Sequence, residues 1–387
     1  MTLESPSKAN HWVESLSVQH FRGFSSLRLD GLGRINLVTG YNNVGKTALL
    51  EALFLSSGQL SINSVLTLNQ LRGIAVFGPV TIASQQAPWR YLFHNFDASA
   101  PVRLWVSTYG DEHIQVSLRA ISDVSEVADE RWSVLRQILA PGSNVPYQQP
   151  LSVETLRPNI LEMYASTPSG EAVNYTVLDQ SGFRSTAFPN ASFRSAIFRT
   201  PGEQFNPQEF AQEFGTIDLR DQLTSFVKGL QLIEPRLMDV RMIVTPAGPF
   251  LHGDIGIGEP VPIRLMGEGT NKLASLLVDA AAVGPGLLLI DELENGFHYS
   301  VLERLWGALD EATRVSGAQI IATTHSLECI RAAHSYFSGK LPLGGSVDFR
   351  LFRLDRVPTE TEPDIIEAVC IDFDSIGHLL EMGLEVR

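Results

Sequence analysis

A short stretch near the start of the chain, Gly40–Thr47, contains the residue types that bind phosphate groups. It reads GYNNVGKT and fits the motif GxxxxGK(S/T). Gly40 and Gly45 allow the backbone to turn so that its N–H groups point at phosphate oxygens, and a helix beginning near Lys46 adds its positive end. Lys46 is expected to contact the β- and γ-phosphates of a nucleotide, and the Thr47 hydroxyl to bind Mg²⁺. We call this stretch the phosphate loop.

Two acidic residues, Asp291 and Glu292, follow an apolar segment in the sequence LLLIDELENGFHYS. The apolar segment, Leu287–Ile290, is typical of a strand that is buried on both faces of a parallel sheet. At the end of such a strand, Asp291 could hold Mg²⁺ through water or Thr47, and Glu292 could polarise an attacking water. The alternative is a strand that ends in a solvated acidic turn. The phosphate loop upstream favours the catalytic interpretation.

A histidine, His325, follows a second apolar segment, Ile320–Ala322, in the sequence QIIATTHSLE. This strand is expected to deliver Thr323, Thr324 and His325 to the sheet edge that carries the acidic pair. A histidine there could hydrogen-bond the γ-phosphate and report its presence. The alternative is a structural hydrogen bond, but the order of the segments favours the sensor.

A glycine-rich segment, LMGEGTNKLASLL, contains Gly267 and Gly269 just before an expected amphipathic helix. Such a helix start is a second anion-binding site. Because the phosphate loop already surrounds the phosphates of one nucleotide, the second site is expected to close over the γ-phosphate of a partner subunit. By itself, the Gly-x-Gly pattern is weak evidence.

The first part of the chain predicts the elements that position the phosphate loop. Residues 13–38 predict a strand, a turn near Gly23 and two further strands, the last of which ends at the loop. Residues 102–121 predict a hairpin that turns at Gly110–Asp111, and Ala140–Pro150 is expected to be a loop. The helix after the phosphate loop carries apolar residues at helical spacing, namely Leu49, Leu50, Leu53 and Phe54.

A helical region is expected after Asn206, which caps it, with Pro207 in the first helical position. The end of the chain predicts strands near Phe349–Arg353 and Ala368–Ile371, followed by a helix. The acidic stretch Asp372–Asp374 is expected to cap that helix rather than to bind a metal. The apolar face of the region after Asn206 is predicted to comprise Leu219, Leu223, Phe226, Val227 and Leu230.

Composition restricts the class of protein. The chain has 387 residues, of which 44% are hydrophobic, and a net charge of −14, which argues against non-specific coating of nucleic acid. Cys329 and Cys370 form neither a disulfide framework nor a zinc motif. The N-terminus lacks a signal-peptide pattern, and the longest uncharged apolar run, Ala280–Ile290, is too short to span a membrane. The sequence therefore predicts a cytoplasmic protein without a membrane partner.

The ordered motifs resemble the ABC-type ATPase heads of the SMC and RecF group, and most closely the OLD-like (overcoming lysogenization defect) AAA-family ATPases. The resemblance covers roughly residues 13–60 and 235–387 and is weaker between them. It implies an α/β fold, a P-loop NTPase of the ABC-ATPase-head type, with a mixed central sheet, an antiparallel β subdomain and a helical insert. The segments that carry it are HFRGFSSLRLDGLGRINLVTGYNNVGKTALLEAL, MGEGTNKLASLL, LLLIDELENGFHYS and ATTHSLE.

The same resemblance implies three parts of the chain. Residues 1–120 are expected to form the N-terminal part of the ATPase head, with the phosphate loop and the β subdomain. Residues 121–234 are expected to form a β and helical insert. Residues 235–387 are expected to complete the head with the glycine-rich segment, the acidic strand and the histidine.

The resemblance also assigns roles to residues of the site. It implies Mg²⁺ at Thr47 and Asp291, Glu292 as general base and His325 as switch histidine, with Lys46 on the phosphates. Arg22 in FRGF matches an arginine that reaches the nucleotide in related heads, and an exposed turn residue is an equal alternative. The residues of the phosphate loop implied to bind ATP are Gly40, Asn42, Asn43, Gly45, Lys46, Thr47 and Ala48.

Gly267, Glu268 and Gly269 match the signature element that related heads present to the nucleotide of a partner subunit. The segment departs from the transporter-type LSGGQ because Gly267 stands at the serine position. Backbone N–H groups and Thr270 would therefore make the contact. The counterpart of the Q-loop glutamine stays open among Gln70, Gln85 and Gln86.

Family resemblance further implies a head-to-tail homodimer around two ATP molecules, or a higher oligomer, that gates a separate effector in phage defence or DNA maintenance. Many OLD proteins continue into a TOPRIM nuclease domain. The chain after His325 is expected only to complete the ATPase sheet, so a TOPRIM-type nuclease would be a separate protein. Other classes considered are a nucleotide-bound scaffold, a small-molecule kinase and a transporter subunit, which the motifs disfavour.

One segment is basic, although the chain as a whole is acidic. It contains three Phe-Arg pairs, Phe183-Arg184, Phe193-Arg194 and Phe198-Arg199. Arginine interleaved with aromatic residues can follow a nucleic-acid backbone and stack on bases, so a nucleic-acid-binding clamp is an alternative function. Strands with Phe inward and Arg outward are the favoured interpretation.

Overall fold

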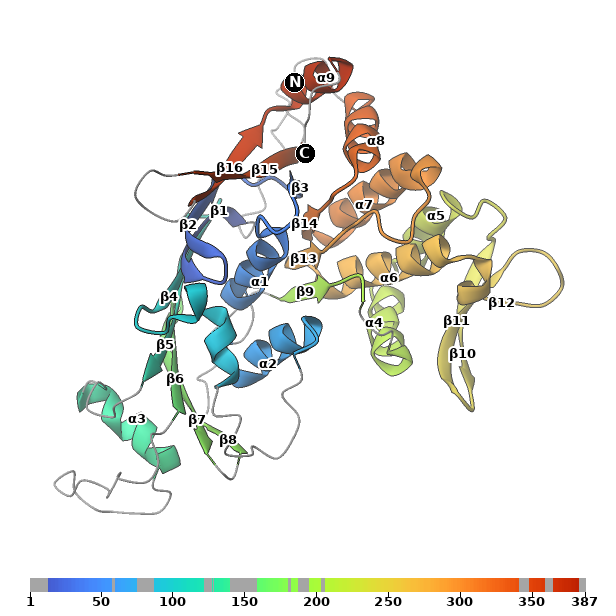
Figure 1. The fold of residues 1–387 in the computed structure, drawn as a ribbon. Coiled ribbons are helices and arrows are strands. Elements are labelled where there is room, and N and C mark those ends of the chain that lie inside the picture. Colours follow the sequence, from blue (N-terminus) through green and yellow to red (C-terminus); the bar gives the residue numbers. More distant parts are fainter. Residues whose placement is uncertain are drawn as a thin grey trace, which may run out of the picture.

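The computed structural model describes residues 13–57, 60–74, 87–121, 127, 129–139, 159–179, 182–186, 195–202, 206–340, 348–358 and 365–382. In these residues two large sheets flank one helix, α1 (Lys46–Ser57), and a layer of helices covers the far face of one of the sheets (Figure 1). The architecture is an α/β P-loop NTPase with a mixed central sheet and an antiparallel β subdomain, as predicted.

The mixed sheet carries the phosphate loop. Its central strand, β3 (Ile35–Gly40), is buried along its whole length and pairs in parallel with β14 and β15. Because the carboxyl ends of parallel strands meet at one edge of a sheet, the segments after β3, β13 and β14 lie together. Among the described strands of this sheet, β16 alone is antiparallel to its neighbour. The strand order is β16 (Ile365–Ile371), β15 (Phe349–Val357), β3, β14 (Gln319–Thr323), β13 (Leu287–Ile290), β9 (Ala196–Arg199).

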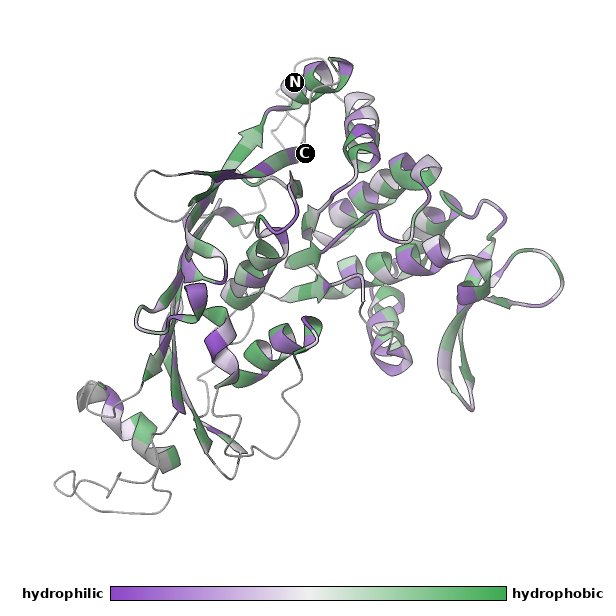
Figure 2. Ribbon diagram, viewed as in Figure 1, coloured by the Kyte–Doolittle hydropathy of each residue, from purple (hydrophilic) through white to green (hydrophobic). Residues whose placement is uncertain are grey.

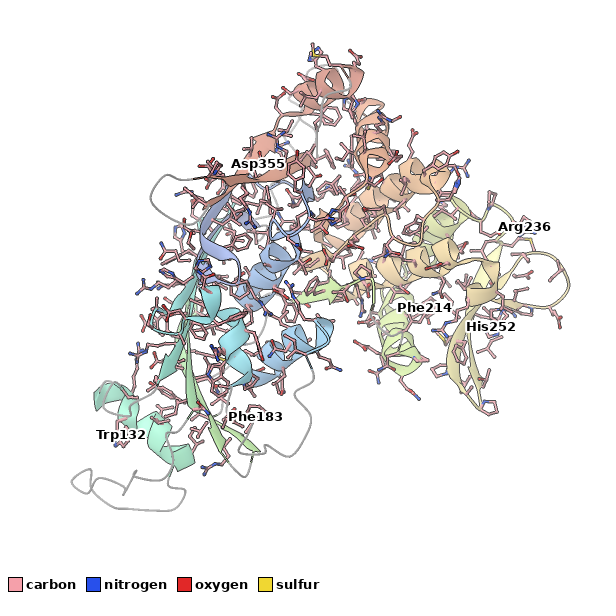
Figure 3. The ribbon with its side chains drawn as sticks, viewed as in Figure 1. Trp132, Phe183, Phe214, Arg236, His252 and Asp355 are labelled. Atoms are coloured by element: carbon pink, nitrogen blue, oxygen red, sulfur yellow. The ribbon has the colours of Figure 1, made fainter. Side chains whose placement is uncertain are left out.

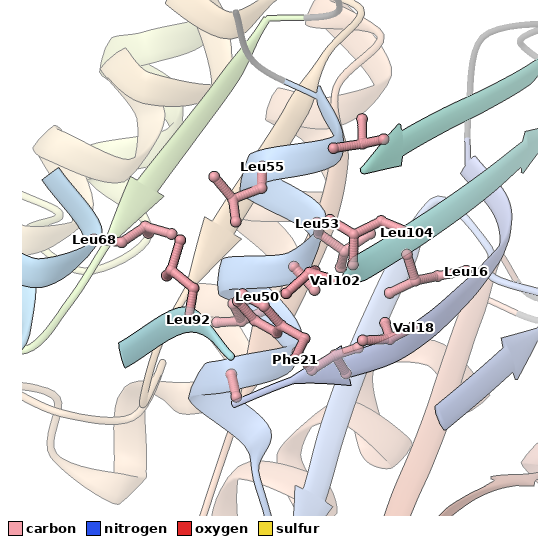
Figure 4. Close-up of a cluster of buried hydrophobic side chains, with 14 of the residues drawn as sticks. Leu16, Val18, Phe21, Leu50, Leu53, Leu55, Leu68, Leu92, Val102 and Leu104 are labelled. Atoms are coloured by element: carbon pink, nitrogen blue, oxygen red, sulfur yellow. The ribbon is translucent and has the colours of Figure 1, made fainter. Parts of the chain in front are cut away.

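The second sheet is antiparallel and packs on the other side of α1. It contains the predicted hairpin, whose turn includes Asp111 with a φ of 58°. Figure 4 shows Leu50 and Leu53 of α1 against Leu16 and Val102 of this sheet. The strand order is β2 (Phe24–Asp30), β1 (Val13–Phe21), β4 (Val102–Thr108), β5 (His113–Ile121), β6 (Asn159–Thr167), β7 (Gly170–Asp179), β8 (Gly182–Ser185).

Alternation along β3 places side chains in two cores. Val38 belongs to the core around α1, whereas Ile35 and Leu37 belong to the core beneath the outer helices. Figure 2 shows α1 and the central strands as largely hydrophobic. The outer helices are α4 (Pro207–Leu219), α5 (Leu223–Gln231), α6 (Glu268–Val283), α7 (Leu302–Ser316), α8 (Leu327–Ser338) and α9 (Phe373–Glu381).

Smaller elements complete the described chain. A three-stranded sheet projects beside α6, and α2 and α3 lie near the antiparallel sheet (Figure 1). These elements are β10 (Asp239–Thr245), β11 (Gly248–Asp254), β12 (Val261–Pro262), α2 (Ile62–Leu71) and α3 (Asp129–Leu139). Short 3-10 turns are Pro88–Leu92, His94–Phe96, Ile263–Met266 and Tyr299–Val301.

The helical region after Asn206 differs in part from the prediction. Asn206 caps α4 by accepting from the N–H groups of residues 208 and 209, as predicted. The region then breaks at Asp221, whose φ is 56°, so α4 and α5 point in different directions. Leu219 is 89% exposed, and its predicted place on a common apolar face with Phe226 and Leu230 is wrong.

The end of the chain folds as predicted, with two strands and a helix whose cap is Asp372, which accepts from the Ser375 N–H group. The expected loop Ala140–Pro150 lies outside the described residues. The division at residues 120 and 234 remains a prediction; β9, from the expected insert, joins the mixed sheet. None of the described helices is long and apolar enough to cross a membrane.

A buried ion pair fixes the start of β3 to the outer helices. Arg34 and Asp310 of α7 bond through side chains that are 3% and 1% exposed. Burial by itself would raise the pKa of Asp310, but the hydrogen bond and charge of Arg34 outweigh it, so the pKa lies below its ordinary value. Arg314 and Lys340 also approach this carboxylate, from half-exposed positions.

Replacing Arg34 with methionine is expected to lower the free energy of unfolding by about 3 kcal/mol at neutral pH, because Asp310 would lose its buried partner. Urea denaturation measures the difference. The folded pKa of Asp310 is depressed, so its contribution is present above the unfolded carboxyl pKa and is lost as pH falls through the folded pKa. Arg28→Met, which breaks an exposed pair with Asp30, is the control and should have little effect. A pH-independent difference for Arg34→Met would contradict this account.

Candidate functional site

The phosphate loop has a backbone that only glycine permits at two positions. Gly40 has a φ of 135°, and a Cβ atom there would lie 2.4 Å from the carbonyl oxygen of Leu354. Gly45 has a φ of 108°, and its Cβ would lie 2.6 Å from the ring of Phe24. Asn43 between them has a φ of 62°. The loop is therefore held in a tight turn between β3 and α1.

Lys46 lies across this loop. Its Nζ atom donates to the carbonyl oxygens of Gly40 at 2.7 Å and Tyr41 at 2.9 Å. Burial lowers the pKa of Lys46 to about 8, although Asp291, Glu292 and Glu294 act in the opposite direction. A phosphate group bound in the loop would place a negative charge beside this ammonium group and so favour its protonated form.

Thr47 and Asp291, which are 244 positions apart in sequence, are in direct contact. The Thr47 hydroxyl donates to Asp291 Oδ2 at 2.8 Å, and the Thr323 hydroxyl donates to Asp291 Oδ1 at 2.6 Å. Hydroxyl and carboxylate oxygens are ligands that suit Mg²⁺, which takes its other ligands from phosphates and water. Among the described residues no group of three or more His, Cys, Asp or Glu side chains forms a self-contained metal site.

Glu292 and His325 face each other beyond this contact. Their side chains are 42% and 37% exposed, and His325 Nε2 lies 3.9 Å from Glu292 Oε1. Glu292 has a φ of 51°, which is unusual for a residue with a side chain. Its N–H group donates to the Thr323 hydroxyl at 2.9 Å, which holds the backbone in this conformation.

Glu294 was missed by sequence reasoning. Its carboxylate accepts from the Thr324 hydroxyl at 2.7 Å and from the His325 N–H group at 2.8 Å. The available signal was the third carboxylate in DELE together with the adjacent threonines of ATTHS. Spacing alone does not show that the two segments meet.

Arg22 is turned toward a protein carboxylate. Its Nε donates to Glu51 of α1 at 3.0 Å, and its NH1 group donates to the carbonyl oxygen of Tyr91 at 2.9 Å. Arg72 binds the same carboxylate at 2.7 Å. The Arg22 side chain is 10% exposed, so the alternative of an exposed turn residue is wrong. A contact of Arg22 with a nucleotide stays a prediction. To make it, the Arg22 side chain would have to leave Glu51.

The signature element forms the start of α6. Gly267 caps the helix with a φ of 122°, and a Cβ on Gly269 would lie 3.3 Å from the ring of Phe297. Lys272 donates to the carbonyl oxygen of Asn295 in the loop after the acidic strand. Thr270 is 4% exposed, contrary to the expected role of its hydroxyl toward a partner subunit; that contact would require the helix start to rearrange.

The remaining predicted residues differ in exposure. Asn42 and Asn43 are exposed at the tip of the phosphate loop, and Ala48 is buried in α1. Gln70 is exposed near the end of α2, whereas Gln85 and Gln86 lie outside the described residues.

The described Phe-Arg pairs do not form a continuous surface. Phe183 lies on β8 at the far end of the antiparallel sheet, and Phe198 lies on β9 (Figures 1 and 3). Phe198 is buried, and Arg199 makes two hydrogen bonds with Asp279 at 2.9 and 2.7 Å. Phe198 therefore points inward as predicted, but Arg199 is not outward, because it is 25% exposed and turns to the buried carboxylate of Asp279 on α6. Phe193-Arg194 lies outside the described residues.

The depressed pKa of Lys46 predicts pH-dependent binding of ATP. Between about pH 7.5 and 9.5 the affinity should fall by up to about tenfold per unit, because the free lysine loses its proton near pH 8 and ATP binding restores it. Titration calorimetry in buffers of different ionisation enthalpy should detect proton uptake at the higher pH. Lys46→Met should bind weakly and without this dependence, and pH-independent binding by the unaltered protein would contradict the prediction.

Several known proteins are similar to this chain or to parts of it. A family model described as "AAA domain, putative AbiEii toxin, Type IV TA system" matches residues 156–331. An ATP/GTP phosphatase of Helicobacter pylori is 22% identical over 333 residues, which are 82% of this chain and 86% of that protein. The DNA replication and repair protein RecF of Idiomarina loihiensis is 48% identical over 44 residues, 11% of this chain and 12% of that protein.

Among solved structures, the SMC head domain from Thermotoga maritima is 13% identical and gives a TM-score of 0.43, covering 93% of this chain and 99% of that one. An SMC head bound to the C-winged helix domain of ScpA is 11% identical with a TM-score of 0.46, over 95% and 99% of the two chains. The phosphate loop, the carboxylates brought to it and the match to an AAA-domain family identify this chain as a P-loop ATPase.

Proposed function

We propose that this protein binds ATP with Mg²⁺, hydrolyses it with Glu292 as general base, and associates head to tail with a second copy to gate an effector. The observation that carries this proposal is the contact of Thr47 with Asp291, because these two side chains suit a cation and Asp291 immediately precedes Glu292, which faces His325. These groups lie at the same edge of the mixed sheet as the phosphate loop.

In this proposal the loop binds the phosphates through its backbone N–H groups, with Asn42, Asn43 and the start of α1 around them. Lys46 leaves the carbonyl oxygens of Gly40 and Tyr41 and bonds the β- and γ-phosphates. Thr47 and Asp291 would hold the cation. A bound Mg²⁺ supplies charge that neutralises the phosphate oxygens during transfer.

The half-exposed carboxylate of Glu292 would accept a proton from a water molecule, and the bond from its N–H group to the Thr323 hydroxyl holds its main chain. His325 would hydrogen-bond the γ-phosphate from the adjacent strand. Both side chains are partly exposed, so they could turn toward a bound nucleotide without displacing buried side chains.

The proposed dimer uses the start of α6. This helix end presents free N–H groups and a positive dipole, which suit a γ-phosphate of the partner copy. Leu265 just before it is 76% exposed, and Tyr41 of the phosphate loop is 62% exposed, so both proposed contact faces include apolar surface. ATP would stabilise the pair through its γ-phosphate, a contact that ADP lacks.

The start of α6 also touches the site within its own chain. Lys272 donates to carbonyl oxygens of Leu293 and Asn295, which follow the acidic pair. A change in that loop on hydrolysis would reach the dimer surface through these contacts. This arrangement supports a dimer that separates when ATP is hydrolysed.

The effector is proposed to be a separate protein in the cytoplasm, for example a TOPRIM-type nuclease. Phage defence and DNA maintenance are the two proposed settings; the short similarity to a DNA replication and repair protein supports the second of them. The nucleic-acid clamp has less support, because Arg199 is paired with Asp279 and approaches Glu213.

Replacing Glu292 with glutamine is expected to reduce kcat for ATP hydrolysis by roughly a hundredfold or more while leaving the Kd for ATP nearly unchanged, because the base is removed but the phosphate loop is intact. A phosphate-release assay and calorimetry measure the two quantities. Glu303→Gln, at an exposed position on α7, is the matched control. Normal hydrolysis by the Glu292 variant would exclude Glu292 as the general base. It would favour the alternative that the protein is a scaffold whose bound nucleotide has a structural role.

The same variant should dimerise in the presence of ATP and Mg²⁺ and remain monomeric with ADP, as measured by light scattering after size exclusion. Adding Gly267→Asp should abolish the dimer but retain ATP binding, because a carboxylate at the helix start repels the γ-phosphate. A monomer with bound ATP in the Glu292 variant would overturn head-to-tail association. A dimer that persists with ADP would overturn the proposed control by hydrolysis.

A further inference from the structure

Two consecutive threonines at the end of β14 bind two carboxylates of the neighbouring loop. Thr323 donates to Asp291 Oδ1 at 2.6 Å, and Thr324 donates to Glu294 Oε2 at 2.7 Å. Both threonines are fully buried. The Leu293 N–H group adds a main-chain bond to the carbonyl oxygen of Thr323 at 3.0 Å. The two strand ends are therefore joined on both sides of Glu292.

The second of these bonds is directional. The Thr324 hydroxyl accepts from the Ser326 N–H group at 3.0 Å, so its own hydrogen is available to Glu294. With one oxygen held in this way, Glu294 turns the other to the His325 N–H group at 2.8 Å. Thr324 thus orients the carboxylate, and the carboxylate fixes the main chain of His325.

The chain is fixed on the other side of His325 as well. Ser326 caps α8 by accepting from the Cys329 N–H group at 3.2 Å. The main chain is thus held on both sides of His325, and its ring lies 3.9 Å from Glu292. Small errors in the position of such a group cost rate, because catalysis depends on orientation.

We propose that Glu294 and Thr324 are positioning residues that hold His325 opposite Glu292. The inference rests on the proposed function, in which Glu292 is the base and His325 contacts the γ-phosphate. Glu294 does not touch the nucleotide in this scheme. It acts through the main chain of His325.

Thr324→Val is the sharpest test, because valine has the shape of threonine but cannot donate to Glu294. Changing Glu294 itself would also remove a charge that faces Lys46 and Lys272. We expect Thr324→Val to lower kcat for ATP hydrolysis roughly ten- to a hundredfold with the Kd for ATP unchanged within about twofold. Thr324→Ser, which restores the hydroxyl, should recover most of the rate.

A double-mutant cycle with His325→Ala separates positioning from general support of the fold. If Thr324 acts through His325, adding Thr324→Val to His325→Ala should change kcat less than about twofold. Multiplication of the two single effects would overturn the positioning role. Equal rates for Thr324→Val and the unaltered protein would overturn it as well.

If thermal unfolding shows that Thr324→Val does not fold, Glu294→Gln replaces it in the double-mutant cycle with His325→Ala. It should likewise lose its effect once His325 is alanine, and an independent effect would count against the proposal. Failure of the proposed function has a different signature, because the unaltered protein would then not hydrolyse ATP or Glu292→Gln would remain active. Additive effects in an otherwise active enzyme would remove only the role of Glu294 and Thr324.

Discussion

The arrangement of the site depends on the hydrogen bonds of Asp291. One carboxylate oxygen accepts from Thr47 at the start of α1, and the other accepts from Thr323 at the end of β14. Its N–H group donates to the carbonyl oxygen of Arg199 on β9 at 2.8 Å. Asp291 therefore holds α1, β14 and β9 together. The positions of Glu292 and His325 depend on these bonds.

A second buried carboxylate connects the antiparallel sheet to the same centre. Glu51 of α1 is 1% exposed and binds both Arg22, from the turn after β1, and Arg72, at the end of α2. Because an unpaired charge in this position would be costly, the two arginines keep the turn and α2 seated on the helix that follows the phosphate loop. The antiparallel sheet is thereby coupled mechanically to α1.

The residues of the candidate site could be predicted from sequence, because short local patterns mark them. Contacts between distant parts of the chain could not be predicted in this way. Apolar runs before Asp291 and His325 indicate buried parallel strands, and the glycines of the phosphate loop have few other uses. The pairing of Arg22 with Glu51 and the burial of Thr270 depend on side chains that meet only in the folded chain. The reversal at Asp221 escaped prediction for a related reason, since nothing in a pattern of leucines marks a residue with positive φ.

The position of β3 in its sheet has a consequence for how the protein is made. Its two neighbours are β14 (Gln319–Thr323) and β15 (Phe349–Val357), which lie far along the chain. During synthesis the ribosome releases β3 and the phosphate loop well before the two strands that flank β3 in the sheet. Until then β3 is an apolar strand with two unpaired edges, a state prone to aggregation. The mixed sheet, and with it the nucleotide site, can therefore form only after β14 and β15 have been synthesised.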